Sequence, residues 1–222
     1  MNAQAAAMMG ASLQPMSFNK PARESNPGTA SATSQPAVES VSLRAATEQD
    51  AAALALVGSA TFLEAFTWML PGADIVAHCR RHHTEAAYAT YLAAPTTRIT
   101  LAVTESDAPV GYAMVAQPEM AEFEVQPKDL ELKRIYMLSR FRRAPLQDAS
   151  GALLPQSPPQ ALLEQAVADA RALGATRLLL GTNTGNERAI AFYRRNGFVQ
   201  AGTRTFQVGS LTCSDYIFAR AL

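Results

Sequence analysis

The chain has 222 residues, with 19 lysines and arginines against 19 aspartates and glutamates, so its formal net charge is zero. Hydrophobic residues make up 48% of it, which is typical of a globular protein, while the balanced charge argues against a nucleic-acid or membrane-surface partner. No apolar run approaches the roughly 20 residues that span a bilayer. The two cysteines, Cys79 and Cys213, are too few for a disulfide scaffold and favour a cytoplasmic protein.

The first forty residues differ in composition from the rest. Residues 1–36 are mainly Ala, Ser, Pro, Asn and Gln with three charged side chains, and they show neither helical nor strand periodicity. We therefore expect residues 1–40 to be a disordered tail. The apolar run near the start is too short for a signal peptide and no basic residue precedes it, so secretion is not expected. Residues 41–222 are predicted to form one folded domain.

The first part of this domain is predicted to be mostly helical. A capping pattern over Thr47–Asp50 precedes an apolar run, which indicates the start of a helix. Pro71 and Gly72 break the chain, and Pro95 is expected to end a helix. The predicted elements are a strand over 41–44, a helix from 47 to 57 that continues over 61–68, and a single helix over 74–92.

Strands and helices then share the rest of the chain. Apolar residues recur at helical spacing over 160–173, where Gly174 stops the helix. The other predicted elements are a hairpin of 98–103 and 110–115, strands over 130–138 and 177–181, a helix over 186–195, and two final strands over 198–208 and 212–219. An α/β (α+β) architecture, with a mixed sheet flanked by helices on both faces, is the simplest one for this order.

Three blocks of the sequence resemble the Gcn5-related N-acetyltransferase (GNAT) superfamily. They are Leu130–Leu138, Leu180–Asn183 and Asn186–Phe198, and the last carries the specific pattern N-x-x-A-x-x-F-Y-x-x-x-G-F. The resemblance covers most of residues 41–222. Within the superfamily, the Thr61–Phe66 segment together with the first block is most similar to the branch that includes polyamine acetyltransferases of the bacterial PaiA type.

This resemblance implies a GNAT-like, mostly antiparallel sheet and an acyltransferase activity. The enzyme would transfer an acetyl group from acetyl-CoA directly to a primary amine of a small molecule, possible acceptors including polyamines, without a covalent acyl-enzyme. An acidic connector before the third strand could attract such a cationic amine, although an ordinary solvated loop is the simpler explanation. The connector contains Glu119, Glu122, Glu124 and Asp129.

The resemblance also implies an acid and a base. Tyr193 would protonate the departing thiolate, and Glu131 would take the amine proton, directly or through water. Glu131 stands eleven residues before Arg142, which is the offset of the catalytic glutamate in histone-acetylating members. The structural alternatives are a core tyrosine with a satisfied hydroxyl, and an exposed strand glutamate paired with Lys133 or Arg134.

The cofactor site is expected to use backbone and amide groups. A strand that splays from its neighbour leaves backbone groups free, so that an extended pantetheine arm can pair with them as an added strand. Tyr136, Met137 and Leu138 would supply that edge. Asn186, at the start of the helix that carries Tyr193, would contact the cofactor's amide groups.

The loop after the third strand departs from the family pattern. The resemblance predicts a phosphate loop of the form Q/R-x-x-G-x-G/A from Arg142 onward, but residues 142–159 are longer and poor in glycine. Missing glycines hinder close approach of the backbone to pyrophosphate. Pro158 and Pro159 would also remove two N–H donors from the start of the next helix, if Ser157 caps it.

Two compensations for this loop are open. Arg142 and Arg143 could bind phosphate by charge-assisted hydrogen bonds, although a solvated basic pair is an equally simple explanation. Alternatively, the phosphate loop lies at 147–152, with Gly151 in it and a helix starting at 153–154. If neither holds, the chain is a degenerate GNAT-fold binding or interaction module that has lost acetyl-CoA binding.

Two further features have weaker interpretations. His78 and His82 lie one helical turn apart, a spacing that can bind a transition metal, but no second pair of ligands accompanies them and we expect a polar helix face without a metal. The paired C-terminal strands would allow a homodimer.

Overall fold

The computed structural model describes residues 39–120, 123–208 and 211–222, so the expected tail lies outside the described residues except for its last two positions. Their helices are α1 (Ala51–Phe66), α2 (Gly72–His82), α3 (Glu85–Ala93), α4 (Pro158–Ala172) and α5 (Glu187–Arg195). Their strands are β1 (Val41–Ala45), β2 (Arg98–Thr104), β3 (Pro109–Ala116), β4 (Asp129–Met137), β5 (Leu146–Gln147), β6 (Leu153–Leu154), β7 (Arg177–Asn183), β8 (Val199–Val208) and β9 (Leu211–Ala221). None of these helices is both long and apolar enough to cross a membrane.

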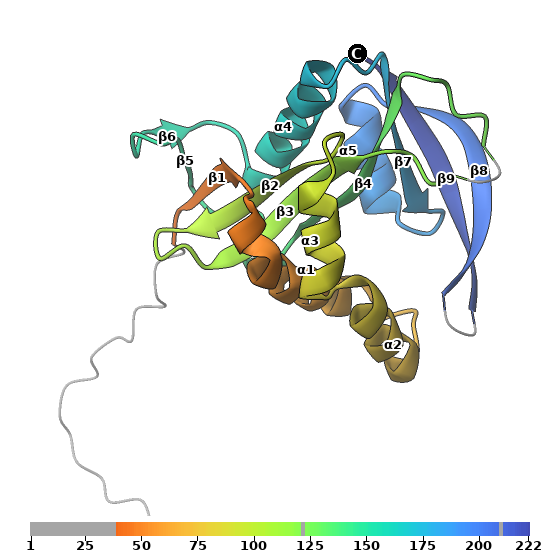
Figure 1. Cartoon of the computed structure of the whole chain (residues 1–222), viewed down its shortest axis with the longest axis horizontal. Helices are drawn as coiled ribbons and strands as arrows, with labels where there is room; N and C mark the ends of the chain where they lie inside the picture. The colour runs from red at the N-terminus through yellow and green to blue at the C-terminus, as the bar shows by residue number, and fades with distance from the viewer. Residues whose placement is uncertain (1–38, 121–122, 209–210) are drawn as a thin grey trace, which may run out of the picture. The chain divides into compact units, whose positions relative to one another are not determined.

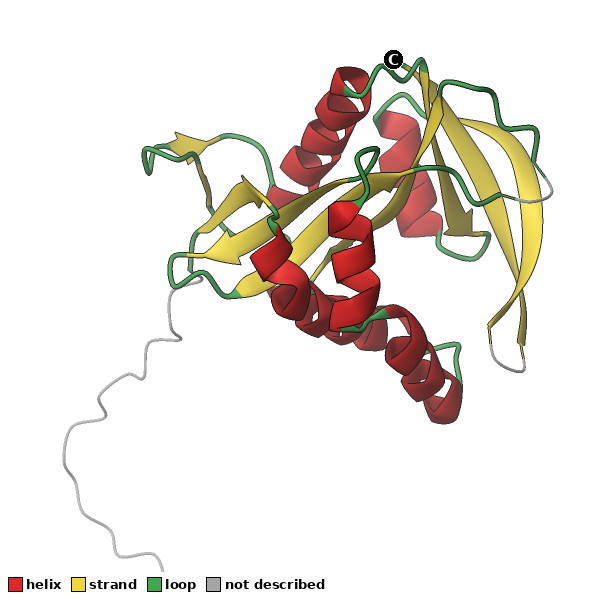
Figure 2. Ribbon diagram, in the orientation of Figure 1, coloured by secondary structure: helices red, strands yellow, loops and turns green. Residues whose placement is uncertain are grey.

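The strands of the described residues form one sheet, in the order β6-β5-β1-β2-β3-β4-β7-β9-β8 (Figure 1). Only the β1–β5 and β4–β7 pairs are parallel, and the other neighbours are antiparallel. Helices α1 and α3 cover one face of the sheet, and α4 and α5 cover the other (Figure 2). This confirms the predicted mixed, mostly antiparallel sheet with helices on both faces.

The two parallel strands in the middle of the sheet stay together only at their beginning. β4 and β7 pair over three positions, which end at Glu131 opposite Leu179. Beyond this point β4 continues to pair with β3 as far as Met137, and β7 continues to pair with β9 as far as Asn183. The facing edges of β4 and β7 therefore diverge, which is the splay expected from the sequence.

A β-bulge in β4 decides which side chains face which layer. The register of the β3–β4 pair shifts at Lys133, which has no partner on β3. Leu132 before the bulge and Ile135 after it both pack into the cluster beneath α4. Arg134 consequently lies on the opposite face of the sheet, where its guanidinium carbon is 5.3 Å from the ring centroid of Tyr88 on α3.

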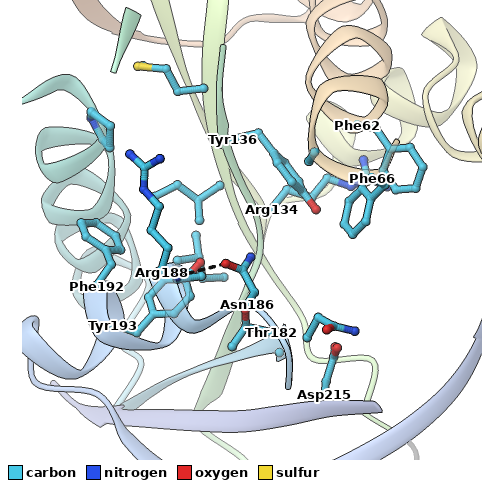
Figure 3. Close-up of a pocket in the computed structure, with 18 of the residues that line it drawn as sticks. Phe62, Phe66, Arg134, Tyr136, Thr182, Asn186, Arg188, Phe192, Tyr193 and Asp215 are labelled. Carbon is cyan, nitrogen blue, oxygen red and sulfur yellow. Dashed lines mark hydrogen bonds between the residues drawn. The ribbon is translucent and has the colours of Figure 1, made fainter. Parts of the chain in front are cut away.

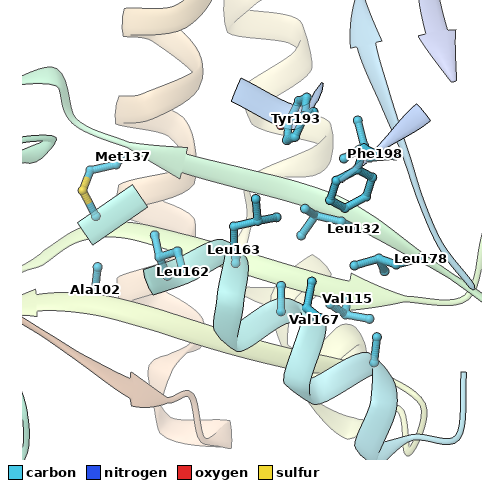
Figure 4. Packing of buried hydrophobic residues seen from close by; sticks show 14 of the residues in the cluster. Ala102, Val115, Leu132, Met137, Leu162, Leu163, Val167, Leu178, Tyr193 and Phe198 are labelled. Atoms are coloured by element: carbon cyan, nitrogen blue, oxygen red, sulfur yellow. The ribbon is translucent and has the colours of Figure 1, made fainter. Parts of the chain in front are cut away.

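The larger hydrophobic core lies between α4, α5 and the sheet (Figure 4). The apolar stripe predicted on α4 fills it, and Leu162 and Leu163 are fully buried there. Each such leucine contributes about 1.5–3 kcal/mol through removal of its side chain from water. From α5, Tyr193 packs into the same cluster, so the core holds the helix that carries the expected acid.

One predicted helix, over 74–92, is wrong, because the chain forms two helices there. α2 ends at His82, and Thr84 caps α3 by accepting a hydrogen bond from the Ala87 N–H at 3.1 Å. The ring of His83, between them, is buried and lies 2.9 Å from the Tyr88 hydroxyl. The cap and this buried contact favour a break that helical periodicity alone does not reveal.

The second placement of the phosphate loop is also wrong. Residues 146–154 form a hairpin of β5 and β6, in which Leu153 and Leu154 belong to a strand and do not start a helix. Gly151 lies in its turn with φ of 82°, the left-handed region that favours glycine. Helix α4 starts at Pro158 instead, so the hairpin is an insertion at the edge of the sheet beside β1.

The close contact of α1 with the α2–α3 junction yields a stability prediction. A methyl group at Gly58 would meet both the His83 Nδ1 atom and the Tyr88 hydroxyl. We expect Gly58→Ala to lower the free energy of unfolding by about 1–3 kcal/mol, although alanine is the better helix former. Urea unfolding followed by circular dichroism measures the change.

Gly72→Ala, at the start of α2, is the matched control because no atom lies within 4 Å of a methyl group at that position. Its free energy of unfolding should stay the same or rise slightly, since alanine restricts the unfolded chain. Equal stability of the two variants would contradict the packing described for Gly58.

Candidate active site

A cavity of about 680 Å³ opens where β4 and β7 diverge. Figure 3 shows Phe192 and Tyr193 of α5 on one side of it, Phe62 and Phe66 of α1 on the other, and Arg134 on β4 between them. Its volume is within the range of small-molecule sites. The splayed strands thus expose a site that both helical layers help to line.

The lining of this cavity is strongly basic. Seven of its residues are basic and one, Asp215, is acidic. A concentration of one charge sign in a cleft attracts ligands of the opposite sign. The basic residues are Lys133, Arg134, Arg142, Arg143, Arg188, Arg195 and Arg204.

The N-termini of α4 and α5 both lie at the cavity. The N-terminus of α4 has few free backbone N–H donors, as the sequence predicts. Ser157 occupies the N-cap of α4 and makes no side-chain capping bond, and prolines occupy the first two helical positions. Only the Gln160 N–H therefore remains among the first three donors of this helix. Ser157 and Pro159 still line the cavity, so the expected phosphate region faces it.

Arginine side chains surround this donor-poor end. Arg142 Nε donates to the Met137 carbonyl oxygen at 3.2 Å, and its Nη2 lies 3.7 Å from a carboxylate oxygen of Glu64. Arg143 is exposed and lines the cavity, as do Arg188 and Arg195 on α5. Sequence analysis missed the two arginines of α5, although their spacing with Phe192 places all three on one helical face.

Tyr193 has a buried ring and an open hydroxyl. The ring is 8% exposed and contacts Phe198 and Phe218. Its hydroxyl makes no hydrogen bond with any described residue, although Tyr193 lines the cavity. Burial raises the pKa of this phenol, so it stays protonated at neutral pH. The alternative of a core tyrosine with a satisfied hydroxyl does not fit this arrangement.

Asn186 is the N-cap of α5 and also lines the cavity. Its Oδ1 accepts a hydrogen bond from the Ala189 N–H at 3.1 Å, which is drawn as a dashed line in Figure 3. The side-chain carbonyl is therefore used for capping. What Asn186 can offer to a ligand is its Nδ2 group, which makes no hydrogen bond with any described residue.

The backbone edge predicted at Tyr136–Leu138 lies on β4 and ends one residue earlier than predicted. Tyr136 and Met137 line the cavity, whereas Leu138 does not, and the Leu138 N–H donates to the Val110 carbonyl oxygen on the β3 side. In an antiparallel pair, alternate residues direct their backbone groups to opposite sides. Met137 and Ile135 therefore direct theirs toward the open edge.

Glu131 is buried next to the cavity without lining it. One carboxylate oxygen accepts a hydrogen bond from the Glu119 N–H at 3.0 Å, and the carboxylate lies 3.7 Å from Lys133 Nζ and 3.8 Å from Arg204 Nη1. The alternative of an exposed glutamate is wrong, because the residue is 5% exposed, although pairing with Lys133 is confirmed. Its role as a base stays a prediction.

Asp215 is the carboxylate that does line the cavity, and sequence analysis missed it. It accepts hydrogen bonds from Nη2 and Nε of Arg204 at 3.1 and 3.3 Å. Burial raises the pKa of the Asp215 carboxyl, and the Arg204 charge opposes that rise. Arg204 thus stands between two buried carboxylates, those of Glu131 and Asp215. No sequence pattern indicates this group, because it depends on β4, β8 and β9 meeting.

Other acidic residues of the expected connector are also paired. Asp129 is the buried first residue of β4 and accepts hydrogen bonds from Arg177 at 2.6 and 2.8 Å, so it is not part of a solvated loop. Glu119 lies 2.8 Å from Lys133 Nζ. Glu122 lies outside the described residues. Glu124 is exposed and accepts a hydrogen bond from Gln126 Nε2 at 3.2 Å. Among the described connector residues, Asp129 and Glu119 thus have their charge paired, whereas Glu124 faces solvent.

The two spaced histidines belong to a cluster of three at the wall of the cavity. His78 stacks on Phe62 with ring centroids 4.0 Å apart and lies 4.6 Å from the His82 ring. Burial lowers the pKa of His78 to about 4 and that of His83 to about 3, so both are neutral at neutral pH. Across the residues the structure covers, no three His, Cys, Asp or Glu side chains are grouped to hold a metal ion.

Besides Leu138, Gly151 is an expected cofactor-binding residue that does not line the cavity. It lies in the β5–β6 turn and is not among the residues that line the cavity. Tyr193, Tyr136, Met137, Arg142, Arg143 and Asn186 all line it, and the structure brings them together from three separate segments of the chain. A single site therefore collects most of the residues chosen from the sequence.

Comparison with known proteins agrees with this fold. Residues 160–198 match the model of the acetyltransferase (GNAT) family. Over 173 residues the chain is 32% identical to uncharacterized N-acetyltransferases of Mycobacterium bovis and Mycobacterium tuberculosis H37Rv, covering 78% of this chain and 98% of each relative.

Solved structures show the same fold at lower identity. The PaiA N-acetyltransferase from Thermoplasma acidophilum, in complex with coenzyme A, has a TM-score of 0.61 at 15% identity, covering 82% of this chain and 99% of that one. The GCN5-related N-acetyltransferase from Rhodopseudomonas palustris has a TM-score of 0.58 at 17% identity, covering 85% and 100%. The chain thus has the fold of these acetyltransferases.

The chain belongs to the GNAT family of N-acetyltransferases. This membership confirms the resemblance found in the sequence and makes the protein an acyltransferase. The acetyl donor of the family is acetyl-CoA, in agreement with the co-substrate expected from the sequence.

Proposed function

We propose that the protein transfers the acetyl group of acetyl-CoA to a primary amine of a small molecule. The observation that carries the proposal is the single cavity between the splayed strands, which joins a basic end to the open hydroxyl of Tyr193. The basic end suits the phosphates of the donor, and the far end leaves room for an acceptor.

The basic end supports acetyl-CoA binding despite its missing glycines. Phosphate loops hold pyrophosphate with backbone N–H groups, but α4 retains only one free donor among its first three. Arg142, Arg143, Arg188 and Arg195 offer charged donors instead, and such hydrogen bonds are about twice as strong as neutral ones. We infer that side chains replace backbone groups as the phosphate ligands.

The open edge of β4 would hold the pantetheine arm. Ile135 and Met137 direct backbone groups to that edge, and a ligand with amide groups can pair with them as an added strand. Nδ2 of Asn186 faces the same cavity and can donate to an amide carbonyl of the donor. Leu138 does not take part, because its N–H is bonded to β3.

Acetyl-CoA supplies an activated thioester, and transfer forms a bond from the acetyl carbon to the amine nitrogen while the bond from that carbon to sulfur breaks. Tyr193 holds a proton at its hydroxyl oxygen for the departing sulfur, because burial keeps the phenol protonated. Asp215 takes the proton that the amine loses. Its raised pKa makes it a stronger base than an ordinary aspartate.

Glu131 has a positioning role in this scheme. It does not line the cavity, and it lies behind Arg204, whose guanidinium also holds Asp215. Removing the charge of Glu131 would alter the hydrogen bonds that Arg204 donates to Asp215. The carboxylate of Asp215 itself would remain. In this proposal Glu131 supports Asp215 as the base, and the base role expected for Glu131 from the sequence is the competing prediction.

The acceptor, the cellular location and the oligomeric state stay predictions. A polyamine acceptor would bring several positive charges to a cavity that already has seven basic side chains, so we favour an amine with less positive charge. A cytoplasmic location agrees with the free thiols of Cys79 and Cys213. A homodimer through β8, at one end of the sheet, also stays a prediction.

Binding of acetyl-CoA to the full-length protein, measured by calorimetry, tests the donor site. We expect micromolar affinity that weakens as salt is raised, and at least about tenfold weaker binding after Arg143→Gln combined with Arg188→Gln. Arg171→Gln, on the exposed part of α4 outside the cavity, should leave affinity unchanged. Failure of the unaltered protein to bind at millimolar acetyl-CoA would support the rival binding module.

Tyr193→Phe tests the acid. Loss of the phenolic proton should lower kcat by about 100-fold or more while KM for acetyl-CoA changes little, because the ring and its packing remain. Steady-state acetyl transfer to an amine that the protein accepts measures both constants. Tyr216→Phe is the matched control, since Tyr216 does not line the cavity. Full turnover by Tyr193→Phe would rule out the acid role.

Asp215→Asn and Glu131→Gln separate the two carboxylates. Asp215 acts when ionised and its pKa is raised, so activity should fall as pH drops through a value above the ordinary 3.8. We expect Asp215→Asn to lower kcat/KM by about 100-fold or more and to remove this acidic limb. Glu131→Gln should keep the limb and lose less activity. The reverse pattern in pH–rate profiles would return the base role to Glu131.

A further inference from the structure

We propose that the acceptor end of the cavity is a carboxylate-binding subsite formed by Arg134, so that the amine acceptor is an amino acid or a similar amine with a carboxylate. The assignment of this subsite to the acceptor rests on the proposed acetyl transfer. The binding of an anion at Arg134 itself can be measured without turnover.

The position of Arg134 is set by the bulge in β4. Without the extra residue Lys133, strand alternation would direct Arg134 toward the apolar core beneath α4. The bulge directs it to the other face, where its guanidinium carbon lies 5.3 and 5.5 Å from the ring centroids of Tyr88 and Tyr91. Contacts of this kind fix the plane of a guanidinium and leave its edge for other partners.

The charge of Arg134 has no carboxylate partner among the described residues. Every other positive group deep in this part of the cavity has one, since Lys133 lies 2.8 Å from Glu119 and Arg204 lies 3.1 Å from Asp215. Arg134 takes part in no ion pair of the described chain. Its side chain interacts with the Tyr88 hydroxyl, but its buried Nη1 atom has no hydrogen-bond partner. A buried charged donor without a partner is costly, and an anionic ligand would satisfy it.

The phosphates of the donor are not suited to fill this place. The N-terminus of α4 belongs to the α4 side of the sheet, whereas Arg134 packs against tyrosines of the α1 and α3 side. The phosphates of acetyl-CoA would be held at the basic end of the cavity, next to the N-terminus of α4. Arg134 is therefore left for the second substrate.

The surroundings of Arg134 favour a carboxylate on an apolar body. Phe62, Phe66 and Met69 line the same part of the cavity, and Figure 3 shows the two phenylalanine rings opposite Arg134. The nearby histidines are neutral, because burial lowers the pKa of His78 to about 4 and of His83 to about 3. A guanidinium without an ion pair, next to neutral histidines, suits a singly charged carboxylate, which its planar fork can bind through two hydrogen bonds.

Calorimetric titration of the full-length protein with 3-phenylpropionate and with 3-phenylpropionamide tests the subsite. The two probes share their apolar body and differ in charge. We expect the acid to bind at least about tenfold more tightly than the amide, both with and without saturating CoA. Equal affinity of acid and amide, or no binding of the acid at millimolar concentration, would overturn the subsite.

Variants then assign the preference to Arg134. Arg134→Met should abolish the preference for the acid, and Arg134→Lys should keep part of it, because lysine retains the charge but not the fork. Arg80→Met, on the exposed part of α2 outside the cavity, should keep the full preference. A preference unchanged in a folded Arg134→Met variant would place the anion elsewhere. The comparison of acid with amide on the unaltered protein stands even if that variant does not fold.

The same titrations distinguish the two proposals. If acetyl-CoA binds and the acid shows no preference over the amide, the carboxylate subsite is overturned and acetyl transfer stands. If the acid is preferred through Arg134 while acetyl-CoA does not bind, acetyl transfer is overturned, and with it the role of the anion as an acceptor.

Discussion

The short pairing of β4 with β7 is the constraint on which the site depends. The two strands are fixed together at their start, where Asp129 pairs in register with Arg177 and their side chains form hydrogen bonds of 2.6 and 2.8 Å. They separate after Glu131, each held by its other neighbour. The gap provides both the cavity and the unpaired edge of β4, and α5 brings Tyr193 to it from the core.

The basic lining shows how a chain can keep this architecture while its phosphate loop changes. The β5–β6 hairpin occupies much of the segment where a glycine-rich loop is expected, and two prolines begin α4. Charged side chains do not need the close backbone approach that glycine permits. Arginines from the loop before β5 and from α5 surround the same end of the cavity. The departure from the family pattern is therefore compatible with its chemistry.

Local patterns predicted the elements well wherever one face of each is buried. The apolar stripe of α4 is an example, because burial of one helix face enforces its periodicity. β2 and β3 are buried on both faces, and the sequence predicts them as short apolar runs between turn residues. Prediction failed where a side chain competes with the regular backbone. The Thr84 cap and the buried ring of His83 divide a helix that composition alone would continue. The turn at Gly151 likewise closes a hairpin in a segment without long apolar runs.

The sequence by itself determined the family, the order of most elements and part of the cavity lining, including Tyr193 and Asn186, because the block from Asn186 to Phe198 is contiguous and its spacing is helical. Only the tertiary structure decided the acceptor end. Arg134 faces the cavity because one extra residue in β4 reverses its side, and Asp215 meets Glu131 through an arginine of a third strand. Such meetings depend on strand register between distant segments, which local spacing does not encode.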